Sequence, residues 1–411
     1  MKFRRIDDLP PYVFATVDAL KRELRHEGRD VIDLGFGNPD IPSPGIAVEK
    51  LREAAANPRN HRYSASRGIE QLRRAVTELY ARRFGVELDP DTQVVNTIGA
   101  KEGLAHLMWV LLEPGDTAVV PTPSYPIHLV APRLAGGTLV GAPTTGGIDA
   151  IEEAVLASRP RVVIVSYPHN PTTAVASPAD MQRLVDLARE HEFVLVNDFA
   201  YADIAFDGHR PPSVLGAEGA HECAVELYSL TKSFSMAGWR VGFVVGRRDV
   251  VAALAKLKSY LDYGTFQPIQ IASTVTLREA ADYPVEVCEV YRRRRDALVG
   301  GLARAGWEIE PPVGTMFAWA PIPEAFRRLG SLEFALRLAR NAGVAVSPGI
   351  GFGEGGDGHV RFALVENEQR IAQATRGIRQ LLRQGPEDHP VTAPSDADDT
   401  SDAYLANTPE S

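Results

Sequence analysis

Five short apolar segments recur through the middle of the chain, separated by stretches with helical periodicity. They lie at residues 117–123, 161–168, 193–199, 224–230 and 241–246. The helical stretch between the second and third segments has Ser177 as its N-cap, Pro178 at its first position and an apolar face. Strands that alternate with helices in this way predict an α/β domain with a largely parallel sheet.

The last third of the chain has a different pattern. Two amphipathic helical stretches, 284–307 and 331–343, are followed by short apolar segments at 343–348 and 359–365. This order predicts a second, smaller α+β domain. We therefore expect four parts, which are an N-terminal segment that packs with the small domain (1–45), a large domain (46–283), the small domain (284–384) and an acidic tail (385–411). The tail has too little apolar surface to offset the entropy of ordering, so we expect it to be disordered.

Charge and composition disfavour several classes of function. The formal net charge is −9, but the acidic tail carries most of it, so the rest of the chain is nearly neutral. The basic run at residues 291–296 fits the solvated face of a helix, so we expect no nucleic-acid partner. No apolar stretch approaches the roughly 20 residues that span a bilayer, and the two cysteines form neither a disulfide framework nor a metal motif. We expect a cytoplasmic protein with no signal peptide, membrane partner or metal site.

Polar residues follow the ends of three predicted strands. The second strand leads to Asn170, the third to Asp198 and Tyr201, and the fourth to Ser229 and Lys232. Open α/β sheets bind ligands at the carboxyl ends of their strands, so these side chains are predicted to meet at one edge. A weaker signal is Gly99-Ala100-Lys101 at the start of a helix, where free N–H groups and the helix dipole favour a phosphate.

This constellation resembles the class I/II aminotransferases, enzymes of fold type I that depend on pyridoxal 5′-phosphate. The resemblance extends to about Arg383 and runs in order through GNPD (37–40), YSASRG (63–68), IGAKEG (98–103), PSYP (123–126), NPT (170–172), NDFAY (197–201), SLTKSFSMAGWRVGF (229–243) and HVRFAL (359–364). It implies a large domain with a mostly parallel central sheet flanked by helices, together with a smaller α+β domain.

The resemblance implies catalytic roles for Lys232, Asp198 and Tyr201. Lys232 would form the Schiff base with the cofactor aldehyde and then move a proton as general base and acid, which requires a partly neutral amine near pH 7. Asp198 would keep the pyridine nitrogen protonated, and Tyr201 with Asn170 would hydrogen-bond the phenolic oxygen of the ring. Tyr125 would stack on the ring face.

The cofactor phosphate would be held by a second group of residues, namely Gly99, Ala100, Lys101, Ser229 and Arg240. Lysine and arginine eight residues apart would then grip opposite ends of one small molecule. Tyr63 would reach the phosphate bound in the other subunit, which implies a homodimer with shared active sites.

The implied substrates are an amino acid and a 2-oxo acid. Arg361 would hold the α-carboxylate through a bidentate fork, beside Asn170. The backbone of Gly37 and Asn38 would close over the substrate. Candidates for reading its side chain are Tyr12, Tyr263 and Phe266.

Three residues depart from the common pattern of this family. Ala100 stands where many relatives have a hydroxyl side chain, so we expect weaker phosphate binding. His169 and Thr173 flank Asn170 and Pro171, and both are expected beside the cofactor. We expect His169 and Thr173 to affect which substrate is used and not the type of reaction.

Four other segments look most like the glutamate–pyruvate (alanine) aminotransferases. They are LPPYVF (9–14), GLAHLM (103–108), SYLDYGTFQPIQ (259–270) and SPGIGFG (347–353). LL-diaminopimelate, aspartate and methionine aminotransferases remain alternatives, as does a lyase or decarboxylase that uses the same cofactor on this fold. The glycine-rich stretches lack the patterns of nicotinamide and P-loop sites. A cofactor-binding domain of a transcription regulator is disfavoured, because no basic DNA-binding domain is evident.

Overall fold

The computed structural model of the chain describes residues 3–7, 9 and 12–386. The tail predicted to be disordered lies outside these residues from position 387 onward. Among the helices of the described part, none combines the length and hydrophobicity that crossing a bilayer requires.

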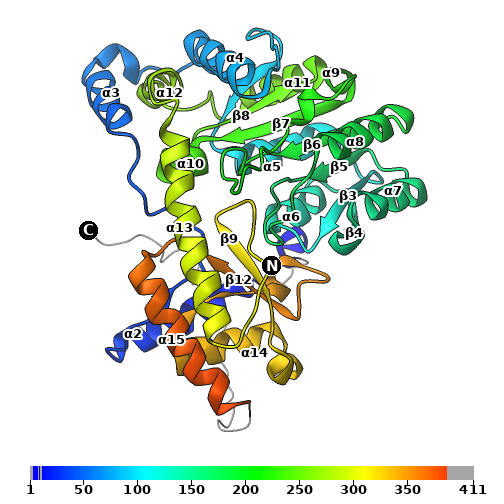
Figure 1. The fold of residues 1–411 in the computed structure, drawn as a ribbon. Helices are drawn as coiled ribbons and strands as arrows, with labels where there is room; N and C mark the ends of the chain where they lie inside the picture. Colours follow the sequence, from blue (N-terminus) through cyan, green and yellow to red (C-terminus); the bar gives the residue numbers. More distant parts are fainter. Residues whose placement is uncertain (1–2, 8, 10–11, 387–411) are drawn as a thin grey trace.

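A seven-stranded sheet forms the centre of the larger part of the molecule (Figure 1). Its strands are β2 (Val94–Thr97), β3 (Thr117–Thr122), β4 (Thr138–Pro143), β5 (Val162–Val165), β6 (Val194–Asp198), β7 (Ala224–Ser229) and β8 (Gly242–Gly246). In the order β2-β8-β7-β6-β5-β3-β4, only β8 runs antiparallel to its neighbours. The predicted, largely parallel sheet is confirmed. Its two unpredicted strands are β4, a mostly unburied edge strand, and the four-residue β2.

Helices cover both faces of this sheet. The helices of the larger part are α3 (Gly45–Ala56), α4 (Glu70–Phe84), α5 (Ala100–Leu111), α6 (Pro126–Leu134), α7 (Gly147–Ser158), α8 (Pro178–Glu190), α9 (Ala220–Cys223), α10 (Leu230–Ser233), α11 (Arg248–Leu261) and α12 (Gln267–Glu279). Apolar side chains of α4, α7 and α8 join one core, and those of α5, α6 and α11 join another. The N-terminus of α8 has the predicted cap, because Ser177 Oγ accepts the N–H of Asp180 at 3.2 Å.

The smaller part is built on a three-stranded antiparallel sheet of order β11-β12-β9. Its elements are α13 (Tyr283–Arg304), β9 (Phe317–Pro321), α14 (Gly330–Arg337), β10 (Val344–Ala345), β11 (Ser347–Pro348), β12 (His359–Ala363) and α15 (Glu368–Gln384). Figure 1 shows α13 running from the large part into the small one. The predicted small α+β unit is therefore present.

The N-terminal segment packs against this smaller part. It comprises α1 (Arg4–Asp7), α2 (Phe14–His26) and β1 (Ile32–Asp33), and β1 pairs in parallel with β10. Val17, Leu20 and Leu24 of α2 share a core with side chains of α13, α15 and the small sheet. The boundaries assigned to the four parts of the chain stay a prediction.

The arginines of the basic run at 291–296 do not all face solvent. Arg294 and Arg295 are buried, and they pair with Asp40 and Asp207 respectively. Both carboxylates come from segments outside α13, so the two arginines fasten this helix to its surroundings. The prediction of a solvated face was wrong for them, because their side of α13 packs against the segments that carry Asp40 and Asp207.

A buried carboxylate lies in the middle of the large sheet, on β7. Glu226 accepts hydrogen bonds from the Tyr80 hydroxyl, the Asn197 amide and the Ser213 hydroxyl, at 2.8–2.9 Å, and from the Val214 N–H at 2.9 Å. Burial outweighs these four donors and raises the pKa of Glu226 to about 6. Since Asn197 lies opposite Glu226 in the ladder, the cluster helps to fix the register of β6 and β7.

Candidate active site

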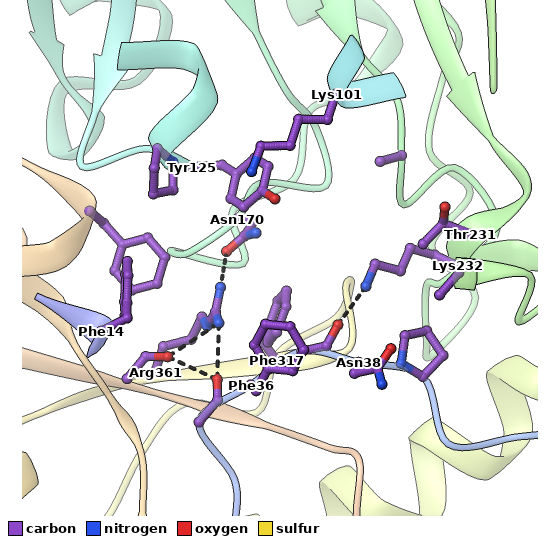
Figure 2. Close-up of a pocket in the computed structure, with 18 of the residues that line it drawn as sticks. Phe14, Phe36, Asn38, Lys101, Tyr125, Asn170, Thr231, Lys232, Phe317 and Arg361 are labelled. Carbon is purple, nitrogen blue, oxygen red and sulfur yellow. Dashed lines mark hydrogen bonds between the residues drawn. The ribbon is translucent and has the colours of Figure 1, made fainter. Parts of the chain in front are cut away.

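A cavity of about 750 Å³ lies where the carboxyl ends of the parallel strands face the N-terminal segment and the small sheet. Its wall combines residues from all three, including most of the sequence-predicted candidates (Figure 2). The position agrees with the general rule for ligand sites on open α/β sheets.

Lys232 lies on the one-turn helix α10, directly after β7. This turn is fixed by Ser229, whose Oγ accepts the N–H of Thr231 at 3.2 Å. The Lys232 ammonium donates to the Gly37 carbonyl at 2.6 Å, as Figure 2 shows. Burial, and then the charges of Arg361 and Arg240, lower the pKa of Lys232 to about 7. A lysine in this state can both accept and release a proton at neutral pH.

Asp198 ends β6 at the same edge of the sheet. Its Oδ2 lies 2.8 Å from Nε2 of His128, which is buried at the start of α6. The other ring nitrogen of His128 lies 2.9 Å from Ser124 Oγ. This chain of contacts fixes the orientation of the carboxylate toward the cavity. Sequence reasoning missed His128, because a histidine in the first turn of a helix carries no sign of a partner 70 residues away.

Asn170, Tyr201 and Tyr125 line the same cavity as Asp198 and Arg361. Asn170 donates to the Tyr201 hydroxyl at 3.4 Å. Burial raises the pKa of the Tyr201 phenol, so it is neutral and can donate a proton in a hydrogen bond.

The candidate phosphate-binding residues converge at the other end of the cavity. Gly99 is the N-cap of α5, with φ 78° and ψ 160°, a conformation that only glycine adopts readily. A Cβ at Gly99 would lie 2.4 Å from Nη2 of Arg240, so the loop and the guanidinium pack closely. Ala100, Ser229 and Arg240 line the cavity here, whereas Gly99 does not and packs against Arg240. Lys101 points into the cavity, with Nζ 5.8 Å from the centre of the Tyr125 ring (Figure 2).

Arg361 projects from β12 of the small sheet. Its guanidinium donates to Asn170 Oδ1 at 2.7 Å and to the Gly35 carbonyl at 3.1 Å. The rings of Phe317 and Phe352 lie with their centres 3.9 and 4.6 Å from its central carbon. Burial lowers the pKa of Arg361 to about 10, which still leaves it charged at neutral pH. Gly37 and Asn38 form the adjoining wall.

Some predicted residues lie elsewhere in the chain. Tyr63 is 87% exposed and packs against Tyr263, with ring centres 5.0 Å apart, and neither residue lines the cavity. Phe266 is also exposed and does not line the cavity, and its ring centre lies 5.9 Å from that of His61, whereas Tyr12 does line the cavity.

The expectation for His169 and Thr173 is corrected, because neither belongs to the cavity wall among the described residues. His169 is buried behind Asn170, where its Nδ1 lies 2.7 Å from Thr172 Oγ1. Burial lowers the pKa of His169 to about 3, so it carries no charge at neutral pH. A polar residue next to a site in sequence need not face it, since successive side chains point in different directions.

An aromatic wall near Arg361 was also missed by sequence reasoning. Phe14 of α2, Phe317 of β9 and Phe352 line the cavity together. Phe14 and Phe352 are in edge-on contact, with ring centres 5.1 Å apart. In the sequence these residues look like ordinary core aromatics, because their shared cavity depends on three distant segments.

Comparisons with known proteins agree with this geometry. The family model for aminotransferase class I and II matches residues 29–378. The glutamate–pyruvate aminotransferase AlaC of Escherichia coli (strain K12) is 48% identical over 93% of this chain and 94% of its own length. An LL-diaminopimelate aminotransferase of Desulforudis audaxviator (strain MP104C) is 42% identical over 92% of this chain and 97% of its own. The substrate-bound BacF structure from Bacillus subtilis matches with a TM-score of 0.87 and 35% identity, over 94% of this chain and 98% of that one.

These matches confirm the resemblance and the fold type predicted from the sequence. They extend over nearly the whole chain. The chain therefore belongs to the class I and II aminotransferases, and it is an aminotransferase of fold type I.

Proposed function

We propose that this aminotransferase uses pyridoxal 5′-phosphate to move an amino group between glutamate or alanine and the 2-oxo acids pyruvate and 2-oxoglutarate. The observation that carries the proposal is a lysine amine with a pKa of about 7, placed between the Asp198 side of the cavity and the carboxylate-binding guanidinium of Arg361. The choice of substrates is supported by the printed name of the Escherichia coli relative, which is 48% identical.

The donor set of the cavity fits this cofactor. One end offers the N-terminus of α5, the hydroxyls of Ser229 and Thr231, and the Arg240 guanidinium, a combination suited to a phosphate. Ala100 contributes no hydroxyl, but the N–H groups of the helix terminus remain. The middle offers Asp198 for a pyridine nitrogen and Tyr125 for a ring face. When bound, pyridoxal phosphate supplies an electron-accepting ring conjugated to an aldehyde.

Lys232 would act as the group that holds and moves the proton at the substrate Cα. Because its pKa is near 7, about half of the amine is neutral at physiological pH and can serve as a base. The Gly37 carbonyl, which accepts from the ammonium, keeps the side chain directed across the cavity. Asp198, oriented by His128, would keep a ring nitrogen protonated, and Tyr201 with Asn170 would donate to a ring oxygen.

Arg361 would bind the α-carboxylate of the substrate. Its guanidinium is already oriented by Asn170 and Gly35, and its faces are covered by aromatic rings, so a carboxylate can approach only along its edge. A planar fork matches two carboxylate oxygens, which lysine does not. The backbone of Gly37 and Asn38 would close the site over the substrate.

A second copy of the chain would complete the site. Tyr63, Tyr260, Tyr263 and Phe266 expose large aromatic surfaces, and such surfaces usually mark an interface. We propose a homodimer in which Tyr63 contacts the cofactor phosphate of its partner. Within each subunit, residues 46–283 would form the cofactor-binding domain and residues 284–384, with the N-terminal segment, the part that closes over the substrate.

The test is a panel of amino acids added singly to the holoenzyme, while the visible absorbance of the bound cofactor is recorded. We expect glutamate and alanine to abolish this absorbance, and pyruvate and 2-oxoglutarate to restore it. If only LL-diaminopimelate, aspartate or methionine does so, the substrate assignment is wrong. If an amino acid is instead cleaved while the visible absorbance of the bound cofactor is retained, the enzyme is a lyase or decarboxylase. Lys232→Ala is the control and should be inactive with every donor.

A further inference from the structure

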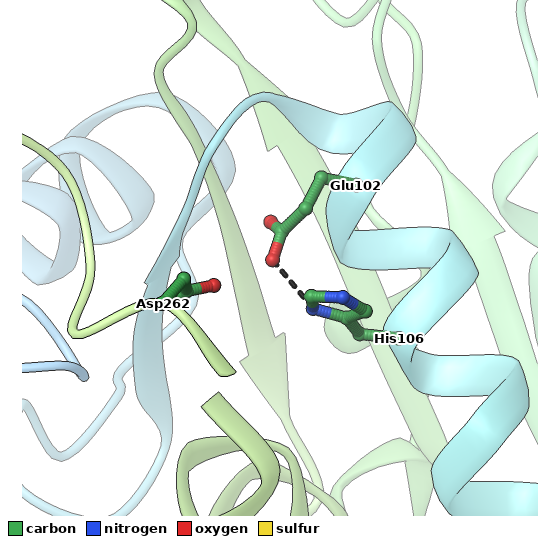
Figure 3. A group of neighbouring side chains, drawn as sticks. All are labelled: Glu102, His106 and Asp262. Carbon is green, nitrogen blue, oxygen red and sulfur yellow. Dashed lines mark ion pairs between the residues drawn. The ribbon is translucent and has the colours of Figure 1, made fainter. Parts of the chain in front are cut away.

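A buried charge network lies beside the phosphate end of the cavity, centred on Lys258 near the end of α11. Its side chain is fully buried, and its ammonium donates to Glu102 Oε1 at 2.8 Å and to Asp262 Oδ2 at 2.7 Å. Figure 3 shows these carboxylates with His106, whose Nδ1 lies 2.6 Å from Glu102 Oε1. Among the described residues this is the one group with the spacing of metal ligands. The ammonium of Lys258 already provides a positive charge for the carboxylates of Glu102 and Asp262.

The second oxygen of Glu102 reaches the candidate phosphate loop. Glu102 Oε2 accepts the N–H of Ile98 at 2.8 Å, one residue before Gly99. The contacts with His106 and Lys258 outweigh burial and lower the pKa of Glu102, so it is ionised at neutral pH. One carboxylate thus connects the buried ammonium to the backbone that precedes the N-terminus of α5.

The second oxygen of Asp262 reaches a different loop, at the exposed aromatic surface. Asp262 Oδ1 accepts the N–H of Gly264 at 2.7 Å and so spans Tyr263, whose φ is 51°. A Cβ at Gly264 would lie 3.0 Å from the Ala65 carbonyl, so this loop packs on the segment that follows Tyr63. The rings of Tyr63 and Tyr263 are in contact at that surface.

We propose that Lys258 is a positioning residue that ties the phosphate loop to the Tyr63–Tyr263 surface through its two carboxylate partners. The inference rests on the proposed function, because it concerns the loop that would hold the cofactor phosphate. The buried ammonium donates to both carboxylates, so replacing either one by an amide removes a charged acceptor and leaves one of its N–H groups poorly paired. A change at Asp262 is therefore transmitted to Ile98 and Gly99, although Asp262 touches neither, and cofactor retention depends on the order of the surface loop.

The test compares release of pyridoxal phosphate from four holoenzymes, which are the wild type, Glu102→Gln, Asp262→Asn and the double variant. Both amide side chains keep an oxygen that can accept the existing backbone N–H, so folding is disturbed little. We expect each single variant to release the cofactor roughly tenfold faster, which corresponds to about 1.4 kcal/mol. The double variant measures the coupling between the two carboxylates: because both act through Lys258, its effect should differ from the product of the two single effects. The matched control, Lys256→Met, changes an exposed lysine two residues away on α11 and should behave as the wild type.

Three outcomes overturn the proposal. If Asp262→Asn releases the cofactor at the wild-type rate, Asp262 has no influence on the phosphate loop. If the increase in release rate in the double variant is the product of the two single increases, the two carboxylates act independently. A lower melting temperature of the variants without faster release shows a purely structural role. Phosphorus NMR of the bound cofactor gives a second readout, since a displaced phosphate loop shifts its resonance in both single variants. A wild-type protein that binds no pyridoxal phosphate would instead refute the proposed function, which is a separate result.

Discussion

The lowered pKa of Lys232 has a measurable consequence for the stability of the protein without cofactor. In an unfolded chain the amine has the ordinary pKa of 10.5, whereas in the folded protein it is about 7. Between these two values the unfolded state binds more protons than the folded state, so the free energy of unfolding rises with pH in this window. Below pH 7 both states are protonated, and the folded state carries the full cost of a buried ammonium.

The difference between the two pKa values sets how much the buried Lys232 amine destabilises the folded state. This destabilisation is about 5 kcal/mol below pH 7, and only about 1–2 kcal/mol at pH 9.5. Since part of the Lys232 side chain contacts solvent, we take about 3 kcal/mol as the upper limit of the change between pH 6 and pH 9.5. Lys232→Met removes the titrating group and retains most of its volume.

Urea unfolding of the two apoproteins at pH 6 and pH 9.5, at one protein concentration, measures this change. We expect Lys232→Met to be more stable than the wild type at pH 6, by a margin that shrinks by about 2–3 kcal/mol at pH 9.5. Any constant gain from the packing of methionine cancels between the two pH values. A margin that stays the same at both pH values would show that the pKa of Lys232 is not lowered, and the reasoning from burial would fail.

Three further predictions test the surrounding structure. Gly99→Ala should cost about 1–3 kcal/mol and weaken cofactor binding by displacing Arg240, whereas Gly28→Ala, at the same φ but in open space, should leave cofactor affinity unchanged by fluorescence titration. His128→Ala should lower kcat roughly 10–100-fold, because the loss of a hydrogen bond to a charged group is worth about 1.5–3 kcal/mol; a kcat within twofold of the wild type would contradict this role. Glu226→Ala leaves four buried donors without an acceptor and should lower the free energy of unfolding by about 3–5 kcal/mol in urea titrations, while an unchanged midpoint would mean that water replaces the carboxylate.

The sequence could predict one side of the site because polar residues follow apolar strands. Asn170, Asp198 and Lys232 are separated by whole βα units, yet parallel strands bring their carboxyl ends to the same edge. The resemblance added Arg361, which no pattern in the small domain would have singled out. These predictions depend on the order of residues along the chain and on the direction of the strands. Both follow from the alternation of apolar strands with helices in a single sequence.

Contacts between distant side chains could not be predicted. The pairing of His128 with Asp198 and the packing of Phe14 on Phe352 each require two segments that are far apart in the chain. The burial of Arg295 depends on Asp207, which lies in a loop of the larger part. Charge and hydrophobicity describe one residue at a time, so they miss partners that only the tertiary structure supplies.

The reversed direction of β8 places Lys232 and Arg240 on one short connection, apart from the small sheet that carries Arg361. Because β8 returns antiparallel beside β7, the connection between them begins and ends at the paired residues Ser229 and Gly242, and it carries both Lys232 and Arg240. The spacing between the amine and the guanidinium is thus set within one short connection, independently of the small sheet that carries Arg361. On the roles proposed above, insertions or deletions in this connection would alter how the cofactor is held, while exchange of the small domain would alter substrate choice. We therefore expect that substrate preference can be changed, in evolution or by engineering, without rebuilding the connection that carries Lys232 and Arg240.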